Sequence, residues 1–78
     1  MPRLPASAVI AALQRLGFEI VRQKGSHVVL RRQSPDPESG KAPVTCVVPL
    51  HRRDLAVGTL ASVLRQAGVD AETFIDAL

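Results

Sequence analysis

Residues 22–27, "RQKGSH", combine the residue types needed for proton transfer next to a phosphate. His27 follows a glycine and a serine, precedes the apolar run "VVL", and has Arg22 and Lys24 on its N-terminal side. An unperturbed imidazole titrates near pH ~6.5 and can therefore exchange protons at neutral pH. Cations beside it suit an anionic substrate. This stretch predicts acid–base chemistry on an anion, with a surface histidine of no chemical function as the alternative.

Two further positions bear on this prediction. Gly25 and Ser26 are turn residues first, although the serine hydroxyl and the backbone amides there can also hold a phosphate oxygen. His51, the second histidine of the chain, stands close to Asp54. A structural role, such as a hydrogen bond to Asp54 or a cap on the following segment, is favoured for His51 over contact with substrate. It remains open as a second acid or base.

A metal or cofactor site is not expected from this composition. The chain has two histidines and one cysteine, without the spacing of zinc ligands. Cys46 lies inside "VTCVVPL", so we expect a small buried hydrophobe and not a reactive thiol.

The charge is unevenly distributed along the chain. The net charge is +3, but residues 1–69 carry ten Lys and Arg against four acids, a balance of +6, because the last nine residues hold Asp70, Glu72 and Asp76 without a cation. Such a basic body suits RNA or another phosphate-bearing partner, while a solvated face is the alternative. The cations form two clusters: Arg22, Lys24, Arg31 and Arg32, and Lys41, Arg52 and Arg53.

The small number of aromatic side chains restricts how a nucleic acid could bind. The chain has no Trp or Tyr, and we expect both phenylalanines, Phe18 and Phe74, in the core. An aromatic platform for stacked bases is therefore not expected.

Two amphipathic helices are predicted from apolar residues repeating at steps of three and four. Each should end at a glycine, Gly17 or Gly68, followed by an apolar residue that folds back on the last turn. Thr59 is the predicted N-cap of the second helix, and Asp70 should cap a last short helical turn whose Phe74, Ile75 and Leu78 pack on the body. The two predicted stripes are Val9, Ile10, Leu13 and Leu16, and Leu60, Val63, Leu64 and Ala67.

Three strands are predicted between the helices, at residues 18–23, 27–32 and 45–50, because these runs are rich in Val and Ile. "KGS" is short enough for a hairpin turn, whereas residues 33–43 form a longer loop with three prolines that we expect to be mobile. The order α-β-β-β-α favours an α+β fold, with both helices on one face of a three-stranded antiparallel sheet. The other face is left for a partner.

The size and hydropathy of the chain predict a cytosolic protein with a single domain over residues 1–78. The longest apolar stretch, Ala8 to Leu13, is far shorter than the roughly 20 residues that span a bilayer. The N-terminus runs directly into the first helix without a cleavage region.

"GFEIVRQKGSHVVL" followed by "VVPLHRRDLAVGTLASVLRQAGV" resembles the HicA family of bacterial toxins, which cleave messenger RNA. The resemblance covers nearly the whole chain and depends on "GSH", "VPxH" and "GTLxxxLxQAG" in that order. It implies a fold similar to the double-stranded RNA-binding domain, a catalytic histidine at His27, and a cognate HicB-like antitoxin that covers the active site. The loop from Gln33 to Pro43 is longer than in the family.

The leading hypothesis is a metal-independent endoribonuclease. RNA carries its own nucleophile, the 2′-hydroxyl, so the protein need only move protons and stabilise charge on the phosphorane. His27 would move the proton, Lys24 with Arg22 or Arg31 would stabilise the charge, and Arg53 would add to RNA affinity. The alternatives are a non-catalytic RNA-binding module and a domain that binds an acidic protein. His27 distinguishes the endoribonuclease from the RNA-binding module, because a binding module needs no proton carrier.

Overall fold

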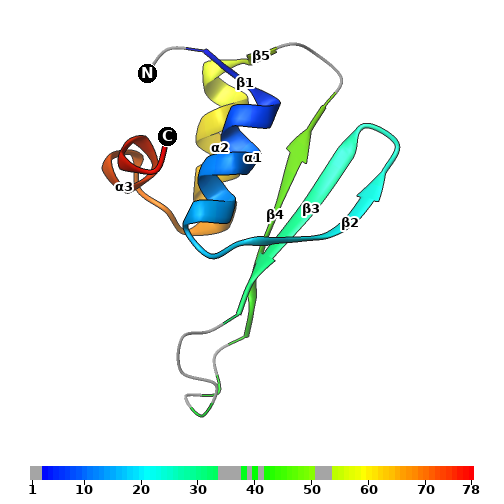
Figure 1. Ribbon diagram of the computed structural model, residues 1–78, viewed down its shortest axis with the longest axis vertical. Coiled ribbons are helices and arrows are strands. Elements are labelled where there is room, and N and C mark those ends of the chain that lie inside the picture. Colours follow the sequence, from blue (N-terminus) through cyan, green and yellow to red (C-terminus); the bar gives the residue numbers. More distant parts are fainter. Residues whose placement is uncertain (1–2, 34–37, 39, 41, 51–53) are drawn as a thin grey trace.

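A computed structural model describes residues 3–33, 38, 40, 42–50 and 54–78 of the chain. It contains the predicted α+β arrangement: a helix, three antiparallel strands and a second long helix, followed by a short C-terminal helix (Figure 1). The elements are β1 (Leu4–Pro5), α1 (Ala6–Arg15), β2 (Glu19–Lys24), β3 (His27–Arg32), β4 (Val44–Pro49), β5 (Asp54–Leu55), α2 (Val57–Ala67) and α3 (Ala71–Asp76).

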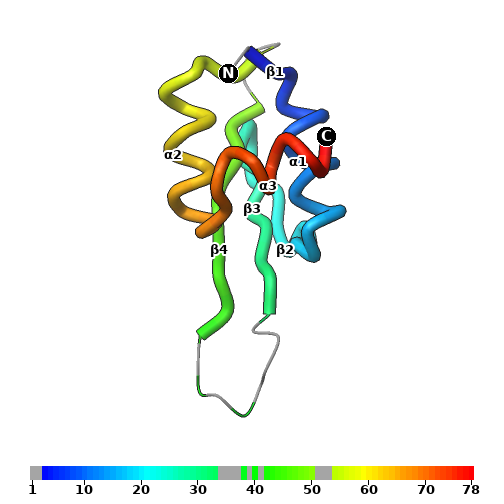
Figure 2. Tube along the Cα trace, turned by 90° about the vertical axis from the view of Figure 1, so that its left-hand side faces the viewer, coloured from blue at the N-terminus to red at the C-terminus, as the bar shows by residue number. Residues whose placement is uncertain are grey.

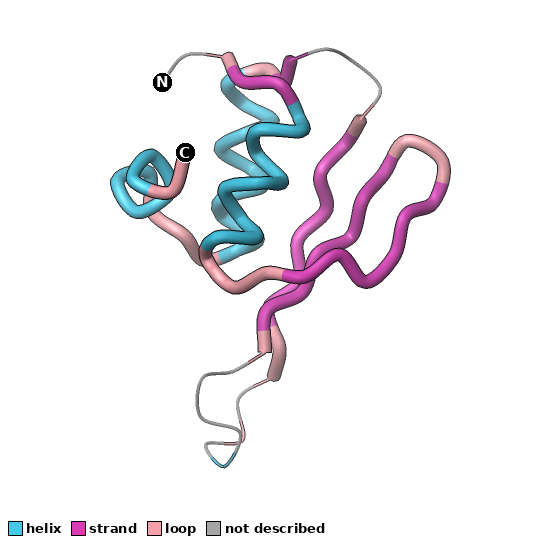
Figure 3. The backbone as a smooth tube through the Cα atoms, in the orientation of Figure 1, coloured by secondary structure: helices cyan, strands magenta, loops and turns pink. Residues whose placement is uncertain are grey.

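The fold has two layers, with the sheet on one side and the helices on the other (Figures 1 and 3). The strands run in the order β2-β3-β4, and both neighbouring pairs are antiparallel. Turning the molecule by 90° shows α1 and α2 side by side over the same face of the sheet, with α3 lying across them (Figure 2). The prediction that both long helices cover one face is therefore confirmed.

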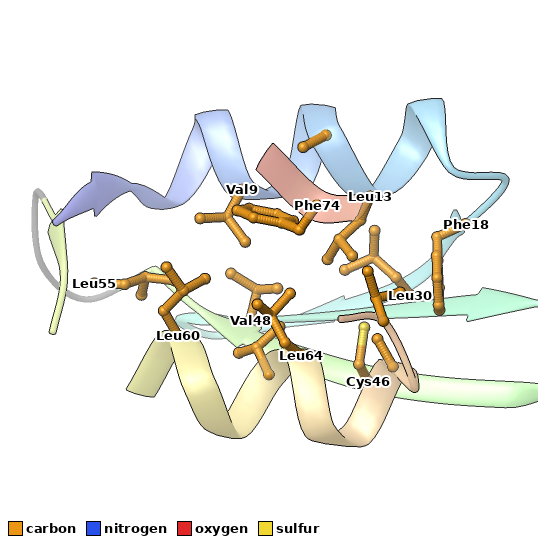
Figure 4. Packing of buried hydrophobic residues seen from close by; sticks show 14 of the residues in the cluster. Val9, Leu13, Phe18, Leu30, Cys46, Val48, Leu55, Leu60, Leu64 and Phe74 are labelled. Atoms are coloured by element: carbon orange, nitrogen blue, oxygen red, sulfur yellow. The ribbon is translucent and has the colours of Figure 1, made fainter. Parts of the chain in front are cut away.

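The core lies between these layers (Figure 4). Strand side chains at alternating positions, Val28 and Leu30 in β3 and Cys46 and Val48 in β4, are at most 2% exposed. Alternation follows from the pleat, which sends successive side chains to opposite faces. Both phenylalanines and Cys46 are buried as predicted, and burial raises the pKa of the Cys46 thiol to about 11. That thiol is not poised to act as a nucleophile at neutral pH.

Both long helices end in the predicted way. Gly17 and Gly68 have φ angles of 97° and 67°, in the left-handed region that glycine occupies without steric cost. The N–H of Phe18 then donates to the carbonyl of Leu13 (3.0 Å), and the N–H of Val69 donates to the carbonyl of Leu64 (3.1 Å). These bonds satisfy carbonyls that the helix end would otherwise leave open. Both predicted stripes contact the core, with Ile10 and Leu16 only partly buried.

Two predictions about local structure were wrong, and one short strand pairing was missed. Helix α2 begins at Val57 after an extended Ala56 and has no side-chain cap, so Thr59 lies inside the first turn. In α3, Ile75 and Leu78 are each 49% exposed, because only the side of this short helix with Phe74 and Ala77 faces the body. The two-residue pairing of β1 with β5 was not predicted at all.

Helix α3 is held at both of its ends. The carboxylate of Asp70 accepts a hydrogen bond from the backbone N–H of Thr73 (2.8 Å), which confirms the predicted cap and lowers the pKa of Asp70. At the other end, the guanidinium of Arg15 in α1 donates to the carbonyl of Ala77 (2.9 Å). Most of the loop from Gln33 to Pro43 lies outside the described residues, so its expected mobility stays a prediction.

Candidate functional site

His27 is the first residue of β3 and lies directly after the turn of the β2–β3 hairpin. Only Gly25 and Ser26 connect the two strands, and Gly25 has a φ of 57°, which confirms the short turn predicted from "KGS". The histidine side chain is exposed, while its backbone is paired on both sides, with Lys24 in β2 and with Pro49 in β4. The sheet therefore holds the backbone of His27 in a fixed place while its imidazole stays accessible.

The hairpin turn is tied to the end of β4. The carbonyl of Ser26 accepts a hydrogen bond from the backbone N–H of Leu50, the residue that follows β4. The "GSH" and "VPL" stretches, which are far apart in the sequence, therefore meet at one end of the sheet. His51 follows Leu50 directly in the chain but lies outside the described residues, so its role stays a prediction.

We call the face of the sheet turned away from α1 and α2 the open face. Val28 and Leu30 of β3 point to the helices and are buried, so the alternating residues His27, Val29 and Arg31 lie on the open face. Residues paired across antiparallel strands share a face. Three residues of β2 therefore join them: Lys24 is paired with His27, Arg22 with Val29, and Glu19 with Arg31.

Three of the predicted substrate-binding cations lie on the open face beside His27. Lys24 is its direct cross-strand partner, and Arg22 belongs to the next pair along the same face. Arg31 is four residues further along β3, which corresponds to roughly 14 Å at about 3.4 Å per residue. All three side chains are exposed. Arg53, like Lys41 and Arg52 of the second cluster, lies outside the described residues.

Arg32 belongs to the same cluster in the sequence but has a structural role. Its guanidinium lies over the ring of Phe18, 4.9 Å from the centroid, and donates to the carbonyl of Leu16 (3.3 Å) at the end of α1. These contacts join the end of α1 to the last residue of β3. Adjacent residues in a strand face opposite ways, so one arginine of the "RR" pair lies on the open face and the other on the helix side.

Gln66 has a role that the sequence did not reveal. Its side-chain carbonyl in α2 accepts a hydrogen bond from the backbone N–H of Val47 in β4 (3.1 Å), and its amide donates to the Ser62 hydroxyl (3.4 Å). Helix α2 thus provides a partner for a backbone group at the outer edge of β4. The residue occurs in the "QAG" stretch, but composition and spacing give no signal for this contact.

Neither a metal-binding cluster nor a membrane-spanning helix occurs in residues 3–33, 38, 40, 42–50 and 54–78. Within those ranges there is no cluster of three or more His, Cys, Asp and Glu side chains that could hold a metal ion. Within the same ranges, no helix is long and apolar enough to cross a membrane.

A comparison with protein families decides which group of proteins has this arrangement. The family model described as the HicA toxin of bacterial toxin–antitoxin systems matches residues 6–69 of the 78-residue chain. The chain belongs to the HicA toxin family. A comparison with individual curated proteins gives no match.

Membership in the HicA family makes the chain the toxin component of a toxin–antitoxin system, so its partner in general terms is an antitoxin. The matched segment contains the β2–β3 hairpin with His27, the whole sheet, and α2 with Gln66. Helix α3 begins at Ala71 and lies outside the segment that this HicA model matches. The resemblance found from the sequence motifs is therefore confirmed at the level of the family.

Proposed function

We propose that this HicA toxin is a metal-independent endoribonuclease that cleaves messenger RNA, with His27 as its main proton-transfer group. The observation that supports this most directly is the pairing of His27 with Lys24 on the open face, which also carries Arg22 and Arg31. A proton carrier and cations on one accessible surface are the groups that cleavage of a phosphodiester requires.

The reaction would proceed by transfer of the phosphoryl group to the neighbouring hydroxyl. The 2′-oxygen forms a bond to phosphorus while its proton moves to a base, and the bond from phosphorus to the 5′-oxygen breaks as that oxygen gains a proton. The products are a 2′,3′-cyclic phosphate and a 5′-hydroxyl. His27 would take or give one of these protons, and His51 is a candidate for the other.

The cations would stabilise the negative charge that develops on the phosphorane oxygens. Lys24 is nearest to His27 in the strand pairing, so it is the first candidate, with Arg22 beside it. The backbone amide of Gly25 and the hydroxyl of Ser26 would bind phosphate oxygens at the turn. Arg31 and Arg53 would contribute to RNA affinity through their charge.

The cognate antitoxin would be a HicB-like protein that covers the open face and so blocks access to His27. A basic surface is complementary to an acidic partner, which also favours fast association. RNA and antitoxin would then compete for the same residues.

Analysis of the cleavage products tests the proposed reaction. The purified toxin is incubated with a short RNA in the presence of a chelator, and the ends of the fragments are identified by mass spectrometry. We expect a 2′,3′-cyclic phosphate or its hydrolysed form, and no cleavage where the nucleotide at the cut is 2′-deoxy. A 3′-hydroxyl end, or cleavage that requires added magnesium, would contradict it. Tight binding of RNA without any cleavage would favour the non-catalytic RNA-binding module.

A further inference from the structure

A pocket of about 310 Å³ lies at the end of β2 and β3 furthest from the hairpin turn, where the edge of the open face meets the end of α1. It is lined by Gly17, Glu19, Val21, Arg31, Arg32 and Gln33. Its volume is at the lower limit of small-molecule pockets, which span about 300–1,000 Å³. His27 is four residues away from Arg31 along β3, so this pocket does not contain the proposed proton-transfer group.

Strand pairing explains why these residues converge. Glu19 and Arg31 are directly paired across β2 and β3, and Gln33 follows β3 immediately. The register shifts between Ile20 and Arg22, so Val21 is the extra residue of a β-bulge. Its side chain is 44% exposed, although it is apolar. Bulges change the direction of a side chain, and this one leaves an apolar surface next to a carboxylate and a guanidinium.

We propose that this pocket binds a guanine base of the RNA, in a nucleotide that flanks the cleaved bond. The proposal rests on the proposed ribonuclease function for its choice of RNA, because Glu19 and Arg31 of the pocket lie on the same open face as His27.

The chemistry of the pocket favours guanine over adenine and cytosine. Two adjacent donors on the Watson–Crick edge of guanine, N1–H and the N2 amino group, match the two oxygens of the Glu19 carboxylate. Adenine and cytosine each offer one amino group beside a ring acceptor, which the carboxylate would repel. Arginine pairs with guanine O6 and N7, so Arg31 can bind the other edge of the same base. Val21 supplies an apolar contact for the ring, in a protein where no aromatic platform is available.

Glu19 is the residue that distinguishes base recognition from simple attraction of phosphate. A carboxylate on a cationic surface repels the RNA backbone, so a surface that served only for phosphate binding would be better without it. Glu19 is exposed, and its replacement by glutamine keeps its size. The variant Glu19→Gln should therefore fold normally, and it removes the carboxylate that faces Arg31 across β2 and β3.

The test uses mononucleotides and an RNA library in parallel. Guanosine, inosine and adenosine monophosphates are titrated into the ¹⁵N-labelled toxin, the Glu19→Gln variant, and the control Glu72→Gln, whose exposed carboxylate lies on α3. We expect guanosine monophosphate to shift the amides of Glu19, Val21 and Arg31 and to bind roughly 5- to 100-fold more tightly than adenosine monophosphate. Inosine monophosphate, which lacks the N2 amino group, should be intermediate. Glu19→Gln should remove the preference and Glu72→Gln should keep it.

Cleavage of a random RNA library by the same three proteins separates this proposal from the proposed function. Fragments from the unaltered toxin should be enriched in guanine at one position near the cut, and Glu19→Gln should lose that enrichment. Equal binding of guanosine and adenosine monophosphates, or tighter binding of both by Glu19→Gln, would overturn the proposal that the pocket recognises guanine. Guanine-selective binding without any cleavage would leave the pocket supported and overturn the ribonuclease function.

Discussion

The side-chain carbonyl of Gln66 in α2 accepts a hydrogen bond from the backbone N–H of Val47 in β4, at 3.1 Å. Unpaired backbone groups at a sheet edge can recruit a strand from another molecule, and covering the edge with a helix prevents this. Helix α2 therefore both buries one face of β4 and provides a partner for one backbone group at its edge. Directly after β4, the backbone N–H of Leu50 donates to the carbonyl of Ser26 in the hairpin turn. The contact between Gln66 and Val47 therefore supports the strand that holds this turn in place.

Replacing Gln66 by alanine should remove the partner of the Val47 amide. The expected loss of unfolding free energy is about 0.5–1.5 kcal/mol, because water can replace the lost hydrogen bond at this exposed position. Hydrogen exchange at Val47 should become faster than in the unaltered toxin. Gln14→Ala, at an exposed position of α1, is the matched control and should change neither property. Unchanged exchange at Val47 in Gln66→Ala would show that the hydrogen bond is not formed in solution.

Replacing His27 by alanine should lower the rate of RNA cleavage by about 10²- to 10⁴-fold, the usual contribution of a general acid or base. The variant should keep its melting temperature and its affinity for RNA to within a few-fold, because the side chain is exposed. Single-turnover cleavage and a binding assay measure these two quantities separately. Equal losses of binding and cleavage would assign His27 to substrate binding alone.

Replacing Lys24 or Arg22 by glutamine should reduce the salt dependence of RNA binding. Each phosphate contact with a single strand contributes about 0.7 to the slope of log affinity against log salt concentration. The slope should therefore fall by about that amount in each variant. Arg65→Gln is a control of equal charge on α2, away from the open face. If the slopes for Lys24→Gln and Arg22→Gln equalled the slope for the control Arg65→Gln, RNA would not bind on the open face.

Replacing Arg32 by glutamine should destabilise the toxin by about 1–2 kcal/mol, because the variant loses the cation–π contact with Phe18 and the hydrogen bond to Leu16. Arg31→Gln, one residue earlier, removes the same charge from the open face and should change stability by less than about 0.5 kcal/mol. Chemical denaturation of both variants makes the comparison. A larger loss in Arg31→Gln would contradict the assignment of the two arginines to opposite faces.

Replacing Phe74 by alanine should cost about 3–5 kcal/mol, because its side chain is fully buried and its loss leaves a cavity. Ile75→Ala removes a large apolar side chain from the next position, but that residue is 49% exposed, so the cost should be less than about 1 kcal/mol. Equilibrium unfolding in urea measures both values. Similar small costs would show that α3, which lies outside the matched family segment, is not docked in solution.

The helices and the sheet could be predicted from the sequence because their signals are local. Apolar residues at helical spacing, Gly17 and Gly68 after the last turns, and the Val-rich runs each indicate an element within a few residues. The start of α2 was missed because no side chain caps it, and the pairing of β1 with β5 because two residues show no periodicity.

The candidate site was predicted only in part, because strand pairing is not visible in the sequence. His27, Lys24 and Arg22 belong to one short hairpin, so their proximity could be predicted from the turn. Arg31 and Arg32 look equivalent in the sequence, and only the pleat of β3 separates them. Glu19 gave no signal, since its importance depends on the register that pairs it with Arg31.

The buried position of Cys46 makes the only thiol of the chain a reporter of folding. A cysteine-specific reagent can reach it only in molecules whose sheet has separated from the helices, and a pKa of about 11 keeps the folded form largely protonated. The labelling rate of the purified toxin therefore reports the fraction of opened molecules, without a dye or tag on the surface. An antitoxin that binds only the folded toxin should slow this labelling in proportion to its occupancy.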